Sequence, residues 1–155
     1  MATALGTGML MKRGVIIALV IVVVRIGLEL LGAPNSVNNI FGVAWLYLIM
    51  PVLFAWRISA IGEASPFRPL FKEVLFFALY TRLIVWGTYM LAYLYQWEAP
   101  RFSVKMGGNV GGNAGPFMGL LLIPLRNAIF WILFATLVGM IIGGIILRLN
   151  KRSST

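Results

Sequence analysis

Residues 14–32 read GVIIALVIVVVRIGLELLG, an apolar run that is long enough to cross a bilayer as one helix. Similar runs follow at residues 40–58, 71–95 and 125–147. Lipid offers the backbone no hydrogen-bond partners, so segments of this kind cross the membrane as helices. The sequence therefore predicts an all-α protein, an integral membrane four-helix transmembrane bundle that forms a single domain over residues 1–155.

The composition agrees with this fold class and excludes several kinds of function. Of the 155 residues, 61% are hydrophobic and 11% are charged, whereas about a quarter of the residues in a soluble domain are charged. The chain has no Cys and no His, which excludes disulfides, thiol chemistry and the usual zinc and haem ligands. We expect no metal, no cofactor and no enzymatic activity, because one intramembrane Glu and several tyrosines make a poor catalytic set.

Two prolines and one long connection shape the predicted topology. Pro51 should kink the second span, because it lacks a backbone donor. Pro124 is expected to break the last apolar stretch, so that residues 117–123 form an interfacial or re-entrant segment before the fourth span. Residues 96–116 form the extracytoplasmic loop, which repeats Gly-Gly-Asn and is interpreted either as a flexible connector or as a lid.

Basic residues are distributed unequally between the two ends of the predicted helices, and this bias predicts the orientation. One end carries Lys12, Arg13, Arg57, Arg68, Lys72, Arg148, Lys151 and Arg152. The other end carries Arg101 and Lys105, with Arg126 near its edge. We therefore expect both termini in the cytoplasm (N-in, C-in) and a bacterial inner (plasma) membrane. Orientation in the membrane accounts for the net charge of +9 without nucleic-acid binding.

Ionisable residues inside the spans are the sharpest functional signal. Arg25 and Arg82 each lie about 16 Å along a predicted helix, near the bilayer midplane. An Arg at that depth costs about 2.5–3.5 kcal/mol on insertion scales, so each needs a partner. Glu29 lies one turn after Arg25 on the same face. The sequence predicts an Arg25–Glu29–Arg82 cluster in the core, which either pins two helices together or lines a pathway for a ligand or ion.

Further polar and aromatic residues lie close to this predicted cluster. Trp86 and Tyr89 follow Arg82 at helical spacing, so the three share a face that either lines a water-filled vestibule or is simply buried. Arg126 and Asn127 add positive charge and polarity near the outer edge of the last span. This excess of positive charge favours contact with an anion or a lipid phosphate, although Arg126 could instead reach the headgroups.

The last span also carries small residues at intervals of four. Ala135, Gly139 and Gly143 allow two helix backbones to approach closely. Their partner is either another helix of this chain or a second subunit.

These observations support two hypotheses for the function. The first is a non-enzymatic accessory or scaffold subunit, which packs against copies of itself or a larger membrane complex and contacts membrane lipids. The alternative is a small channel or transporter for an anionic solute, which uses the intramembrane Arg and Glu residues. A wet cavity lined by Arg82 and Arg126 favours transport, whereas an exposed face bearing Gly139 and Gly143 favours the subunit.

Overall fold

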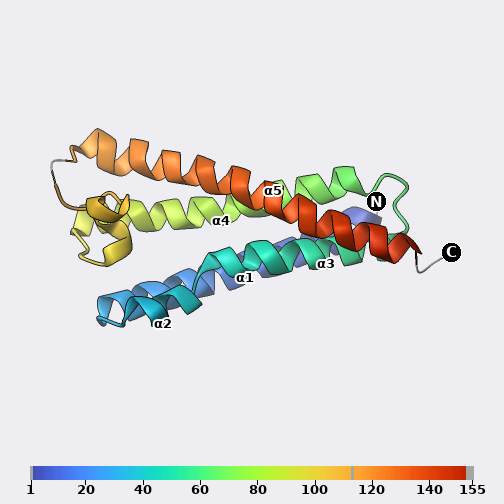
Figure 1. Ribbon diagram of the computed structural model, residues 1–155, viewed down its shortest axis with the longest axis horizontal. Helices are drawn as coiled ribbons and strands as arrows, with labels where there is room; N and C mark the ends of the chain where they lie inside the picture. Colours follow the sequence, from blue (N-terminus) through green and yellow to red (C-terminus); the bar gives the residue numbers. More distant parts are fainter. Residues whose placement is uncertain (1, 113, 153–155) are drawn as a thin grey trace.

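The computed structural model describes residues 2–112 and 114–152, and helices dominate it (Figure 1). In that part of the chain the long helices are α1 (Ala2–Leu30), α3 (Leu46–Ile61), α4 (Phe67–Tyr95) and α5 (Ile123–Arg152). Shorter elements are α2 (Asn35–Ile40), 3₁₀ turns at Val43–Trp45, Pro100–Phe102 and Val104–Met106, and a π-helical segment at Met118–Leu122. Asn113, in the second Gly-Gly-Asn repeat, lies outside the described residues.

The long helices pack as one bundle, which confirms the predicted all-α class. Helix α5 contacts both α3 and α4, and α1 contacts the same two helices. Figure 1 places both chain ends and the α3–α4 connection at one end of the bundle. Helix α2 and the segment between α4 and α5 lie at the opposite end, which we call the loop end. The core between the helices includes the fully buried Phe54, Ile58, Leu70 and Phe77.

The outer surface of the bundle is apolar, as expected of a protein that lies in lipid. Phe130, Leu133 and Leu137 of α5 are each more than 60% exposed. Among the described residues, three helical stretches are long and apolar enough to cross a membrane: Asn35–Ile61, Phe67–Tyr95 and Met118–Lys151. The fold is therefore that of a polytopic helical membrane protein. The predicted first span falls on α1, and its membrane crossing stays a prediction.

Several helix boundaries differ from those predicted, and the largest difference is the start of α1 at Ala2 instead of residue 14. Helix α3 begins at Leu46 instead of residue 40, because the chain turns through α2 and a 3₁₀ turn before it. Helix α4 begins at Phe67, so Pro69 lies in its first turn instead of in a loop. The first turn of a helix tolerates proline, because backbone N–H groups there have no acceptor within the helix.

The predicted break at Pro124 is wrong, whereas the interfacial or re-entrant position of residues 117–123 stays a prediction. The π-helical segment leads directly into α5, and the N–H of Ile123 bonds to the carbonyl of Met118, five residues back. Pro124 has no N–H for the carbonyl of Leu120, four residues before it. The indole nitrogen of Trp86 donates to that carbonyl instead, at 3.3 Å. A side chain from α4 thus satisfies the group that the proline leaves open, and the helix continues.

The small residues of α5 pack against α3 and α4 within the chain. A Cβ atom added at Gly139 would lie 2.6 Å from Cγ1 of Val74 and 3.0 Å from Cγ of Pro51. A Cβ added at Gly143 would lie 2.8 Å from Leu70 and 3.2 Å from the carbonyl oxygen of Pro51. Pro51 thus lies inside α3, where Gly139 and Gly143 of α5 pack against it. The predicted close approach occurs within this chain.

Replacing Gly139 by alanine should destabilise the bundle. The added methyl group overlaps Val74 and the ring of Pro51, and overpacking of this kind costs about 1–3 kcal/mol. Gly144→Ala is the matched control, because its Cβ meets only Phe67 at 3.4 Å and alanine favours a helix. Thermal melting followed by circular dichroism in detergent should show a lower midpoint for Gly139→Ala and no loss for Gly144→Ala. Equal midpoints for the two variants would contradict this packing.

Candidate functional site

Arg82 lies halfway along α4 and points into the bundle, where it is 9% exposed. Its Nε donates to the hydroxyl of Tyr47 at 2.8 Å, and that hydroxyl lies 2.8 Å from Oγ1 of Thr81. Its guanidinium carbon lies 4.8 Å from the ring centroid of Trp131 and 5.2 Å from that of Tyr47. These ring faces attract the cation, which lowers the cost of burying it. Among the described residues, no carboxylate forms an ion pair with Arg82.

Glu29 joins two other arginines. Its Oε1 accepts a hydrogen bond from Nε of Arg25 at 2.9 Å, as the spacing of four residues predicted. Its Oε2 lies 2.9 Å from Nε of Arg101, which comes from the 3₁₀ turn after α4. The Glu29 side chain is only 4% exposed, so this carboxylate is held between two cations with little solvent around it. The carboxylate of the predicted cluster therefore pairs with Arg25 and Arg101, and Arg82 stands apart from it.

Arg101 has the less complete set of partners in this group. Its Nε forms an ion pair with Oε2 of Glu29, and its buried Nη2 has no hydrogen-bond partner. Burial lowers the pKa of Arg101 from its ordinary value, Glu29 works against that shift, and Arg25 adds to it. An Arg stays protonated in proteins even so. Arg101 is therefore a buried cation with unused donors.

A central cavity of about 180 Å³ brings the three arginines together. Arg25 of α1, Arg82 of α4 and Arg101 all line it, although they belong to three different parts of the chain. The rest of its wall comes from the 3₁₀ turn after α2 and from the helices around it: Val22, Gly42, Val43, Ala44, Val85, Tyr89 and Trp131. Glu29, which pairs with two of these arginines, is the nearby carboxylate, so positive charge exceeds negative charge around this cavity.

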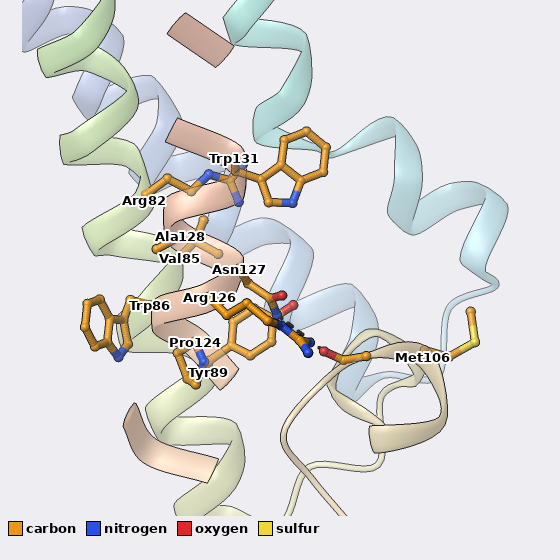
Figure 2. A pocket seen from close by; sticks show the side chains of 11 residues that line it. Arg82, Val85, Trp86, Tyr89, Met106, Pro124, Arg126, Asn127, Ala128 and Trp131 are labelled. Carbon is orange, nitrogen blue, oxygen red and sulfur yellow. Dashed lines mark hydrogen bonds between the residues drawn. The ribbon is translucent and has the colours of Figure 1, made fainter. Parts of the chain in front are cut away.

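An outer cavity of about 210 Å³ lies on the other side of Arg82, between α4 and α5 (Figure 2). Figure 2 shows Arg82 reaching from α4 toward Trp131 of α5. Lower in the same view, Arg126 and Asn127 gather near Tyr89. The predicted contact residues Trp86, Tyr89, Arg126 and Asn127 all line this cavity, together with Met106 and Gly107. The two cavities share a wall of Arg82, Val85, Tyr89 and Trp131.

The segment between α4 and α5 is folded over the loop end of the bundle. Its Asn109 is fully buried, and the side-chain amide donates to the carbonyls of Tyr89 at 2.7 Å and Gly119 at 2.8 Å. Gly108 allows this fold, because a Cβ there would lie 2.2 Å from the backbone of Phe102. The described part of this segment is therefore held against α4 and the π-helical segment, and its role as a flexible connector or as a lid stays a prediction. The segment covers the cavities through Arg101, Met106 and Gly107.

Sequence reasoning found some members of this site and missed others. It found Arg25, Arg82, Tyr89 and Arg126, because charged and aromatic residues within apolar runs stand out. It missed Arg101, which was counted only as a loop charge, since nothing in the sequence shows that the loop folds back against α1. It also missed the partners of Arg82, which are Tyr47 and Trp131. Both resemble ordinary apolar positions of a span.

Comparison with known proteins adds no further identification. No protein-family model, curated protein or solved structure matches this chain significantly. The fold and composition of the chain define its class: it is a polytopic helical membrane protein with an arginine-lined interior.

Asn109→Ala should loosen the segment that covers the cavities. The change removes one buried and one partly buried hydrogen bond and leaves two carbonyls without that partner, at a cost of about 1–3 kcal/mol. Asn127→Ala is the control, because its bond to Gly107 is exposed and 3.4 Å long. Limited trypsin cleavage after Arg101 and Lys105 should accelerate in the first variant only. Unchanged cleavage in Asn109→Ala would show that this amide does not hold the segment.

Proposed function

We propose that this protein is a small channel or transporter for an anionic solute. The observation that carries the proposal is that Arg82 and Arg126 line one cavity, while Arg82 also lines the cavity of Arg25 and Arg101. Four guanidinium groups therefore surround two adjoining cavities, with Glu29 as the carboxylate paired to two of them. A negatively charged solute offsets this excess, whereas a cation meets repulsion.

Burial makes this charge excess significant. Isolated charges are costly to hold in a low-dielectric interior, and intramembrane ionisable residues commonly mark substrate or ion pathways. Arg82 would be simpler to accommodate as an apolar residue if it served packing alone. Its Nε is used by Tyr47, and the hydrogen bonds found in the described residues leave its two terminal amino groups to the cavities. These groups are available to a ligand.

At the loop end, the outer cavity reaches the protein surface, where a solute can enter. The outer cavity is lined by Met106 and Arg126, which are both exposed on the protein surface. A solute entering beside them reaches Arg82, whose side chain borders both cavities. The volumes lie below the range of about 300–1,000 Å³ that is typical of pockets for drug-sized ligands. We therefore infer a small solute.

For the topology, we propose four spans with both termini in the cytoplasm of a bacterial plasma membrane. The basic residues at the end of the bundle that carries both termini support this orientation. The cavities then open toward the extracytoplasmic side.

The accessory-subunit hypothesis has less support. It rested on the small-residue face, the aromatic-rich helices and the lack of redox or acid–base side chains. Of these, Gly139 and Gly143 of the small-residue face pack against α3 and α4 of the same chain. Assembly with copies of itself or with a larger complex stays a prediction.

Single cysteines should establish the orientation, because the chain has no Cys of its own. Ser65→Cys lies in the exposed α3–α4 connection, and Met106→Cys lies at the loop end. In intact cells, a membrane-impermeant maleimide should label Met106→Cys and should label Ser65→Cys only after the membrane is broken. The reverse pattern would overturn the orientation, and labelling of both in intact cells would overturn the number of spans.

Flux through proteoliposomes tests the proposed function. Purified protein in liposomes should take up radiolabelled chloride or phosphate faster than protein-free liposomes do. Arg82→Gln should lower that uptake at least tenfold, because it removes the buried charge that borders both cavities. Arg68→Gln should leave uptake within about twofold, because Arg68 is an exposed cation beside the α3–α4 connection, away from the cavities.

Uptake equal to that of empty liposomes for both anions would overturn the proposal. Uptake that is unchanged in Arg82→Gln would also overturn it, because the arginine-lined cavities would then lie off the pathway.

A further inference from the structure

We propose that the ligand of these cavities is an oxyanion, of which a phosphate group is the clearest example, held between Arg82 and Arg101. The inference rests on the proposed function and deepens it, because it names the chemical class of the anion. Both arginines line the central cavity, and they reach it from different elements: Arg82 from the middle of α4 and Arg101 from the 3₁₀ turn beyond it.

The unused donors of the two side chains define the ligand class. Within the described residues, Arg82 donates one hydrogen bond, from its Nε to the hydroxyl of Tyr47. Arg101 has its Nη2 buried without a hydrogen-bond partner, while its Nε faces Oε2 of Glu29 at 2.9 Å. A guanidinium presents its N–H groups as a rigid planar fork, which matches the paired oxygens of a phosphate or carboxylate. A halide offers a single atom and cannot match two forks in this way.

Glu29 shows that arginines of this site already bind one oxyanion, its own carboxylate. Its carboxylate is itself an oxyanion, and each of its oxygens lies 2.9 Å from Nε of one arginine. It accounts for one negative charge, whereas three guanidinium groups line the central cavity. The remaining positive charge is available to a second oxyanion, which competes with Glu29 for Arg101. Removing the Glu29 charge should therefore strengthen binding.

The phosphate group could belong to a free solute or to a lipid headgroup, since both present the same oxygens. The outer cavity reaches the surface beside Met106 and Arg126, where either could enter. Phosphorus assays on the organic and aqueous extracts of purified protein separate the two sources. Phospholipid partitions into the organic extract and inorganic phosphate into the aqueous one.

The test is a calorimetric titration of the detergent-purified full chain with inorganic phosphate, and separately with chloride at equal ionic strength. Phosphate should bind saturably with one site per chain, and chloride should bind at least tenfold more weakly. Arg101→Gln should weaken phosphate binding at least tenfold, because it removes one of the two forks. Glu29→Gln should strengthen binding severalfold. Arg68→Gln, at an exposed position beside the α3–α4 connection, should bind as the parent protein does.

A second pair of variants distinguishes a loss of binding from a loss of folding. Arg82→Lys and Arg101→Lys keep the charge but lose the fork, and circular dichroism melting checks that each is folded. Both should bind phosphate several times more weakly than the parent, with little change toward chloride.

The outcomes separate this inference from the proposed function. Chloride binding as tight as phosphate binding would overturn the oxyanion class and leave the anion site standing. Binding of neither anion, with no phospholipid in the organic extract, would overturn both. Stoichiometric phospholipid that is lost in Arg101→Gln would support the oxyanion class, assign its source to a headgroup, and remove the support for a free solute.

Discussion

The burial of guanidinium groups within an apolar bundle is the constraint on which the loop end of this protein depends. Arg25 and Arg101 share the carboxylate of Glu29, and Arg82 has a tyrosine hydroxyl and two aromatic faces in place of a carboxylate. Each arrangement needs partners from other elements, because no single helix carries both the cation and everything that compensates it. The charges therefore fix how α1, α4, α5 and the segment after α4 meet. They also leave positive charge in excess around the two cavities.

The two halves of the bundle are packed by opposite means. Toward the chain ends, Gly139 and Gly143 bring α5 close to Val74, Leu70 and Pro51, with no room for an added Cβ. Toward the loop end, large rings and arginines line the two cavities. If the protein transports a solute as proposed, a pathway across the whole membrane would require α5 to separate from α3 and α4 at these glycines.

The segment between α4 and α5 is hydrogen-bonded to the π-helical segment that precedes α5. The shifted hydrogen bonding before Pro124 leaves carbonyls that Trp86 and Asn109 satisfy. A Cβ at Gly119 would lie 2.1 Å from the Tyr93 ring, so this residue allows the π-helical segment to pack on α4. The covering segment, the irregular helix turn and α4 therefore form one hydrogen-bonded unit around the outer cavity. Movement of one part alone would leave buried polar groups without partners.

The sequence alone determined the helical membrane class, the positions of most helices and the Arg25–Glu29 pair, because hydropathy and a spacing of four residues are local properties. It also marked Arg82, Tyr89 and Arg126 as unusual, since charge within an apolar run is visible without a fold. Only the tertiary structure decided that Arg101 takes the second oxygen of Glu29, that Tyr47 and Trp131 hold Arg82, and that the helix continues through Pro124. Those outcomes depend on which groups, distant in sequence, come close enough to satisfy a buried charge or carbonyl. The residue pattern within one segment carries no information about such long-range contacts.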